Sequence, residues 1–151
     1  MSTEIVHIPE FTLEAGTVLR DVPVAFRTWG SLNAGGTNAI VICHALTGNP
    51  EADDWWADLL GPGRALDTDR YFVVCANVMG SPYGTASPLT TNPDTGEPWG
   101  NEFPATTVRD TVALHRVLLD RLGVTQVLFA IGGSLGGMQA LEWAFHDDFV
   151  R

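Results

Sequence analysis

The chain has 151 residues, 45% of them hydrophobic, and a formal net charge of −10 from 18 acidic residues against eight arginines and no lysine. This apolar content predicts one folded domain over residues 1–151 and excludes a disordered chain, while the acidic charge disfavours nucleic acid and anionic membranes as partners. The N-terminus lacks a signal-peptide pattern, no segment reaches membrane-spanning length, and Cys43 and Cys75 lack the spacing of metal ligands, so we expect a cytoplasmic protein without a metal.

The first 76 residues contain several short extended segments. Glu4–Ile8 and Val22–Trp29 read as edge or hairpin strands. The apolar run Ala39–Cys43 predicts a central strand that ends in the tight turn His44–Gly48. A short helix is expected over Trp55–Leu60, and Tyr71–Cys75 predicts a third apolar strand.

The second half alternates between loop, helix and strand. Residues 77–104 are rich in Gly, Pro, Ser and Thr, and so long a loop at the carboxyl end of a central strand is expected to wall a ligand site. Thr107, with Asp110 three residues on, predicts the start of a helix that ends at Gly123. Val127–Ile131 then predicts a strand buried on both faces. Leu135, Met138, Leu141 and Phe145 mark one side of a following helix. This alternation predicts an α/β protein with a parallel sheet.

Residues 132–136 read Gly-Gly-Ser-Leu-Gly, which fits the pattern G-x-S-x-G between a buried strand and a helix. Such a turn needs flanking residues without bulk, and it presents the Ser134 hydroxyl as a nucleophile at the sheet edge. The backbone N–H of Leu135, at the helix start, would face a developing oxyanion. A phosphate-binding loop is excluded because lysine is absent and the glycine spacing is wrong, whereas a serine that merely caps the helix remains an alternative.

The order of motifs resembles the first half of an α/β-hydrolase fold and, within it, the homoserine O-acetyltransferases. The resemblance covers nearly the whole chain and rests on residues 43–48, 61–63, 66–72, 80–84, 92–96, 103–110 and 132–143. It implies the N-terminal half of a mostly parallel sheet with helices on both faces, ending after the nucleophile helix. Leu135 departs from the methionine that the family usually carries, but only its backbone N–H is required.

The resemblance also implies a reaction. Ser134 would take an acetyl group from acetyl-CoA and pass it to the hydroxyl of L-homoserine, a ping-pong transfer that opens a route to methionine, with Leu46 and Leu135 supplying the oxyanion N–H groups. Acetyl-CoA would be a co-substrate, with no permanently bound cofactor, and full-length family members are expected to be homodimers. Residues 80–84 resemble the acetyl-using branch. Succinyl transfer, a serine acceptor, plain ester hydrolysis and a non-catalytic fragment remain alternatives.

The rest of a catalytic triad is not apparent in the sequence. On this fold the acid and then the histidine follow the serine, yet only 17 residues follow Ser134. His44 adjoins the oxyanion turn, but this position more often shapes the turn than acts as a base. The remaining candidates fall in an edge segment, on helices or in loops: His7, Asp53, Asp54, Asp110, His115, His146, Asp147 and Asp148. We therefore expect the N-terminal portion of a longer enzyme, with little turnover alone and an exposed apolar sheet edge at Val127–Ile131.

Overall fold

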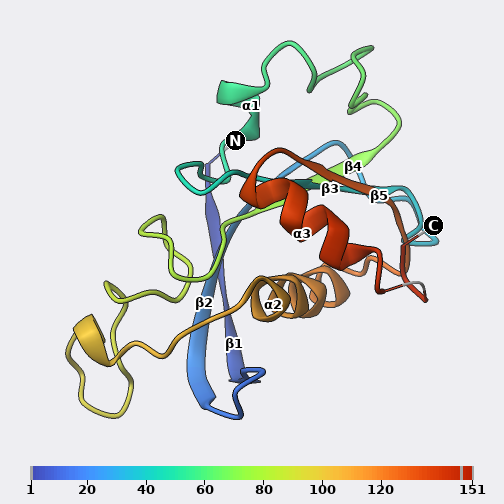
Figure 1. Cartoon of the computed structure of the whole chain (residues 1–151). Helices are drawn as coiled ribbons and strands as arrows, with labels where there is room; N and C mark the ends of the chain where they lie inside the picture. Colours follow the sequence, from blue (N-terminus) through green and yellow to red (C-terminus); the bar gives the residue numbers. More distant parts are fainter. Residues whose placement is uncertain (1, 147, 151) are drawn as a thin grey trace.

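The structure is a computed structural model that describes residues 2–146 and 148–150. Five strands form one sheet in the order β1-β2-β4-β3-β5 (Figure 1). They are β1 (Glu4–Thr12), β2 (Val18–Trp29), β3 (Ala39–Cys43), β4 (Phe72–Ala76) and β5 (Val127–Gly132). Strands β4, β3 and β5 are parallel, while β1 pairs antiparallel with β2, and β2 with β4. The predicted α/β class is confirmed, with an antiparallel hairpin added at one side of the parallel strands.

Several boundaries in the first half differ from the sequence prediction: β2 begins at Val18 instead of Val22, and β4 is Phe72–Ala76 instead of Tyr71–Cys75. Strand β1 continues past Pro9, because β1 is an edge strand and a residue without an N–H is tolerated there. The helix predicted over Trp55–Leu60 is wrong: α1 is Ala52–Trp55, with two acidic residues in its first turn, where they favour a helix N-terminus. Leu60 instead pairs with Leu66 in an isolated bridge.

Helices cover both faces of the parallel strands, as expected. Alternate residues of β3 explain the division, because successive side chains of a strand point to opposite faces. Val41 and Cys43 pack in the cluster that contains residues of α2 (Val108–Arg121) and α3 (Leu135–Trp143). Ile40 and Ile42 pack on the other face, in the cluster that contains Ala52 of α1. A short 3-10 helix (Gly100–Glu102) is the only helix of the described residues between β4 and α2.

Over residues 2–146 and 148–150, every helix falls short of the length and apolar character that a bilayer crossing requires.

The last strand departs from its predicted burial. Phe129 and Ile131 of β5 are 40% and 37% exposed, so the prediction that both faces of this strand are buried is wrong for the described residues. This exposure follows from the position of β5 at the edge of the sheet. It pairs with β3 along one side, and along its other side, among the described residues, only Val127 pairs, with Val150. The expected exposed apolar edge is therefore confirmed.

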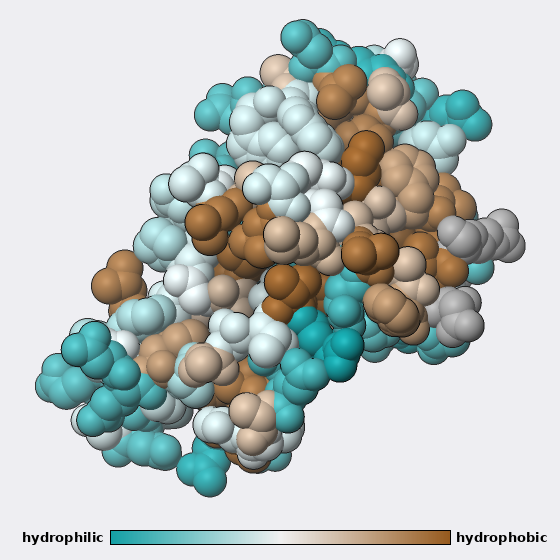
Figure 2. All heavy atoms as spheres, in the orientation of Figure 1, coloured by the Kyte–Doolittle hydropathy of each residue, from teal (hydrophilic) through white to brown (hydrophobic). Residues whose placement is uncertain are grey.

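The predicted apolar side of α3 also faces outward. Met138, Leu141 and Phe145, on α3 and just beyond it, are 60%, 68% and 74% exposed, and Figure 2 shows apolar side chains gathered over this helix. The helix packs on the sheet through Gly136, Gln139 and Trp143 instead. Gly136, on its buried side, brings its backbone close to β3.

Candidate active site

Ser134 lies at the sharp turn between β5 and α3, as the sequence predicts. Its backbone has φ 56° and ψ −124°, a conformation that residues with a side chain rarely adopt. The residue is exposed and lines a pocket together with the turn after β3. Strain of this kind persists only where the surrounding structure enforces it, and it commonly marks a functional site.

Two glycines enforce the turn by allowing backbone contact with β3. A Cβ on Gly132 would lie 2.3 Å from the Cys43 carbonyl oxygen, and one on Gly136 would lie 2.0 Å from the same atom. Gly133 has open space around it, and a Cβ on Gly137 would make an ordinary 3.4 Å contact. Gly132 and Gly136, the first and last glycines of G-x-S-x-G, are thus required for close packing of the elbow on β3. Gly133 and Gly137 are not required for it.

The turn after β3 presents a free amide. The Ala45 carbonyl accepts hydrogen bonds from the Gly48 N–H and from His44 Nδ1, each at 2.8 Å. Because the Ala45–Leu46 peptide is planar and trans, fixing the carbonyl directs the Leu46 N–H to the opposite side. Among the described residues, the N–H groups of Leu46 and Leu135 donate no hydrogen bond. Two unpaired donors therefore stand at the carboxyl ends of the neighbouring strands β3 and β5, where an oxyanion site would need them.

His44 holds this turn. Its side chain is 1% exposed, and with the proton on Nδ1 its Nε2 accepts from the Val78 N–H at 3.1 Å. Burial lowers the pKa of the His44 imidazole, against the opposing effects of the Ala45 carbonyl and of the Asn77 amide oxygen, which lies 3.1 Å from Nε2. A neutral ring with both nitrogens occupied acts as a brace rather than as a base for Ser134.

A second brace comes from Gln139, which is 1% exposed on α3. Its Nε2 donates to the His44 carbonyl at 3.1 Å, so the nucleophile helix and the oxyanion turn are directly joined. The sequence carries little signal for this role apart from a polar residue among the small and apolar residues of α3.

The other histidines do not approach Ser134. His7 pairs with Asp21 on the exposed hairpin, and burial lowers the pKa of the His115 imidazole on α2 to about 4. Of the histidines, only His44 lines the pocket of Ser134, and none of the described carboxylates lines it. His146 follows α3, and Asp147 lies outside the described residues. Within the part of the chain that the structure describes, His, Cys, Asp and Glu form no group of three that could hold a metal ion.

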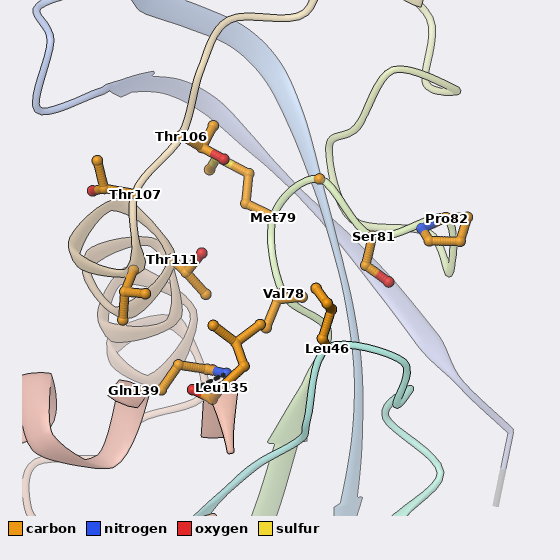
Figure 3. Close-up of a pocket in the computed structure, with 12 residues that line it drawn as sticks. Leu46, Val78, Met79, Ser81, Pro82, Thr106, Thr107, Thr111, Leu135 and Gln139 are labelled. Carbon is orange, nitrogen blue, oxygen red and sulfur yellow. Dashed lines mark hydrogen bonds between the residues drawn. The ribbon is translucent and has the colours of Figure 1, made fainter. Parts of the chain in front are cut away.

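A cavity of about 340 Å³ borders both Leu46 and Leu135 (Figure 3). Its other walls come from residues 78–82, from residues between 106 and 111 at the start of α2, and from Gln139 of α3. Only these first residues of the long loop thus wall this cavity. A later part of the loop contacts β2 instead, where the Ala86 N–H donates to the Pro23 carbonyl.

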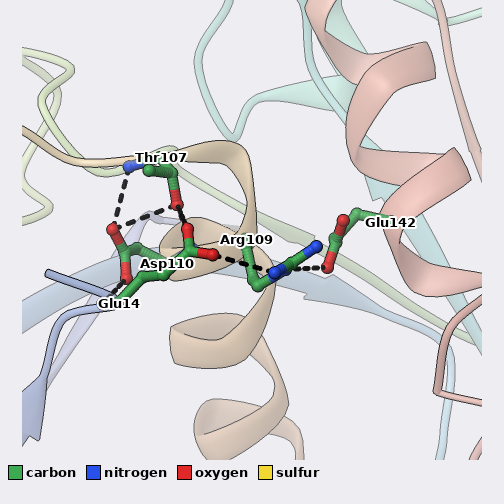
Figure 4. Close-up of polar contacts among 5 residues, drawn as sticks. All are labelled: Glu14, Thr107, Arg109, Asp110 and Glu142. Carbon is green, nitrogen blue, oxygen red and sulfur yellow. Dashed lines mark hydrogen bonds and ion pairs between the residues drawn. The ribbon is translucent and has the colours of Figure 1, made fainter.

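The start of α2, which borders this cavity, is held by a helix cap and by ion pairs; Figure 4 shows these contacts. The predicted cap is confirmed: Thr107 Oγ1 accepts from the Asp110 N–H at 3.0 Å, and Asp110 Oδ2 accepts from the Thr107 N–H at 2.9 Å. Arg109 contacts Glu14 after β1 and Glu142 on α3, at 2.8 and 2.9 Å. The hairpin, α2 and α3 are therefore linked at this point.

Comparison with known proteins supports the fold described above. A family model described as alpha/beta hydrolase fold matches residues 38–151. The chain is 62% identical to the homoserine O-acetyltransferase of Salinibacter ruber over 154 residues, covering 99% of this chain and 44% of that protein.

Comparison with solved structures finds the same fold in two proteins. A homoserine O-acetyltransferase from Bacillus anthracis superposes with a TM-score of 0.88 at 32% identity, covering 99% of this chain and 44% of that one. Esterase E22 superposes at 0.89 and 33% identity, covering 99% and 45%. The chain thus spans less than half the length of these relatives and matches their N-terminal part. Its fold, its elbow and the family model together show that the chain belongs to the α/β-hydrolase family.

Proposed function

We propose that this chain is the nucleophile-bearing part of a homoserine O-acetyltransferase. One observation carries the chemistry: an exposed serine held in a strained turn, next to two backbone N–H groups that donate to no other group of the described residues. The 62% identity to the Salinibacter ruber relative supports the substrates, acetyl-CoA and L-homoserine.

The reaction would proceed in two transfers. Ser134 Oγ loses its proton to a base and attacks the thioester carbonyl carbon of acetyl-CoA, while the N–H groups of Leu46 and Leu135 stabilise the oxyanion. The C–S bond breaks, the thiolate leaves with a proton, and the acetyl group stays on Ser134. The homoserine hydroxyl then attacks this ester, and Ser134 recovers its proton as O-acetylhomoserine leaves.

The base and its acid partner are proposed to come from polypeptide outside the described residues. Of the histidines, only His44 shares the pocket of Ser134, and both of its ring nitrogens are engaged. A serine without a base is a weak nucleophile, so the chain alone should show little or no turnover.

Ester hydrolysis is the second candidate, favoured by the similarity to esterase E22. The two activities differ in whether water or an amino-acid hydroxyl accepts the acyl group. Transfer would require that water be kept from the acyl-serine, a task proposed for parts of the protein beyond these elements.

The test is a complementation assay. The chain is mixed with, or fused to, the part of the Salinibacter ruber relative that it does not match, and CoA release is followed with a thiol reagent. We expect CoA release that depends on L-homoserine and disappears in Ser134→Ala. The chain alone is the control.

Release that is independent of homoserine would identify a hydrolase instead. Release that persists in Ser134→Ala would remove Ser134 from the mechanism. Turnover by the chain alone would show that the base lies within it, and no turnover by any complemented form would favour a non-catalytic chain.

A further inference from the structure

A series of hydrogen bonds connects the interior of α2 with the turn after β3. It begins at His115, a buried residue of α2, whose Nε2 lies 3.1 Å from the Asn77 carbonyl oxygen. A carbonyl oxygen can only accept, so this ring nitrogen carries a proton and donates. Burial lowers the pKa of the His115 imidazole to about 4, and the ring is therefore a neutral donor near pH 7.

The backbone of Asn77, just after β4, is fixed on both sides. Its N–H donates to the Ala25 carbonyl of β2 at 2.8 Å, and its carbonyl also accepts from Thr85 Oγ1 at 2.9 Å. Because the Asn77–Val78 peptide is planar and trans, fixing this carbonyl directs the Val78 N–H to the opposite side, where it donates to His44 Nε2 at 3.1 Å. The donors to the Asn77 carbonyl thus set the direction of a bond that ends on the His44 ring.

The same arrangement is repeated at the turn after β3. His44 Nδ1 donates to the Ala45 carbonyl, and the planar peptide that follows directs the Leu46 N–H away from it. A neutral imidazole with its proton on Nδ1 makes both bonds at once, because Nε2 is then able to accept from Val78. Two peptide planes and one imidazole ring therefore connect the His115 side chain with the Leu46 amide.

We propose that His115 is a positioning residue, which acts through His44 to aim the Leu46 N–H at the oxyanion. The inference rests on the proposed function, because it assumes that an oxyanion forms beside Ser134. The buried residues that follow His115 on α2 are leucines, so an apolar side chain would satisfy packing at this position. The imidazole contributes an N–H donor that such a side chain lacks.

The test compares two substitutions at His115. His115→Leu removes the donor, whereas His115→Gln keeps one, because the glutamine Nε2 is separated from Cα by the same number of bonds as the imidazole Nε2. The control is Leu118→Val, at another buried residue of α2 whose side chain makes no hydrogen bond. All variants are made in the fusion of this chain with the part of the Salinibacter ruber relative that it does not match.

The first measurement is the rate of acetyl transfer. His115→Leu should lower kcat by about ten-fold, a part of the roughly 100-fold or greater loss that removal of a whole oxyanion donor causes. The KM values for acetyl-CoA and L-homoserine should not change, because the Leu46 amide stabilises the transition state. His115→Gln and Leu118→Val should keep the kcat of the unmodified fusion.

Thermal unfolding should rank the variants differently. The midpoint should fall for Leu118→Val, which loses a buried methylene. It should stay unchanged or rise for His115→Leu, because the Asn77 carbonyl keeps its bond from Thr85 and is not left unpaired. A variant that is stable but slow, beside one that is less stable but fast, separates positioning from a merely structural role.

The second measurement needs no turnover. The fusion is labelled with ¹⁵N-leucine and ¹⁵N-histidine, and the Leu46 amide is identified in NMR spectra by the loss of its signal in Leu46→Met. We expect this signal to shift in His115→Leu and to keep its position in His115→Gln and Leu118→Val. The His44 ring should show a proton on Nδ1 and a bare Nε2.

Three results would overturn the proposal. The first is a Leu46 amide signal that does not move in His115→Leu. The second is a kcat that falls equally in the leucine and glutamine variants. The third is a proton on His44 Nε2, bonded to the Asn77 amide oxygen 3.1 Å away, since Nε2 could then not accept from Val78.

These outcomes are distinct from failure of the proposed function. An inactive fusion in which the Leu46 signal still shifts in His115→Leu alone would refute the function and keep the connection from α2 to the turn. Acetyl transfer that proceeds normally in His115→Leu would refute the positioning role of His115 and leave the function intact.

Discussion

Replacing Gly136 by alanine tests how the nucleophile elbow is held. The added Cβ would lie 2.0 Å from the Cys43 carbonyl oxygen and 3.2 Å from that of His44. Both are backbone atoms, and real Cβ contacts stay beyond 3.0 Å, so α3 or the end of β3 must move by roughly 1 Å. Overpacking of this kind destabilises a protein by about 1–3 kcal/mol, and backbone contact places Gly136→Ala at the upper end. This exceeds the gain of about 1 kcal/mol that alanine brings to a helix.

Gly137→Ala is the matched control in the same helix. Its Cβ would make an ordinary contact at 3.4 Å, so alanine should leave stability unchanged or raise it by up to about 1 kcal/mol. Thermal unfolding followed by circular dichroism should show a midpoint lower by roughly 2–8 °C for Gly136→Ala and unchanged or higher for Gly137→Ala. The complemented Gly136→Ala protein should also lose acetyl transfer by about 100-fold, because a 1 Å displacement separates Ser134 from the oxyanion amides. Equal midpoints for the two variants would refute the claim that backbone contact at Cys43 fixes the elbow.

Three further results are expected. Ser134→Gly should raise the free energy of unfolding by about 1–3 kcal/mol in urea titrations, since glycine relieves the positive φ, whereas Ser134→Ala should not. Burial lowers the pKa of His115 from 6.5 to about 4, so below pH 6.5 the unfolded chain binds a proton that the folded chain excludes. The free energy of unfolding should therefore fall by about 3 kcal/mol as the pH drops from 6.5 to 4. In His115→Gln the free energy of unfolding should change less over this pH range. Burial raises the pKa of the Cys43 thiol to about 12 and that of Cys75 well above its ordinary value, so a thiol reagent at pH 8 should modify neither in the folded chain and both in denaturant.

Local patterns predicted the parts of the site that depend on local chemistry. The Thr107 cap and the Ser134 elbow were predicted because capping and tight turns require particular residues at fixed spacing. The assignment of Ser134, Leu46 and Leu135 to catalysis stays a prediction, although the exposed serine and the free amides suit it.

Features that depend on distant partners could not be predicted. The burial of β5 was misjudged because an apolar run shows what a strand can bury, while its neighbours in the sheet decide what it does bury. The bond from Gln139 to the His44 carbonyl joins residues 95 positions apart, a separation that no periodicity reveals. The helix predicted over Trp55–Leu60 begins three residues earlier, because Asp53 and Asp54 favour a helix N-terminus at that point.

The close approach of Gly132 and Gly136 to the Cys43 carbonyl decides when the Ser134 turn can form during folding. The two sides of this contact are the end of β3 and the join of β5 with α3, which are neighbours in space but are separated in the chain by β4 and α2. Contacts between such remote segments form late, since the loop between them must first close. A nascent or partly unfolded chain therefore lacks the strained turn at Ser134, and this turn forms only once β3, β5 and α3 have packed together.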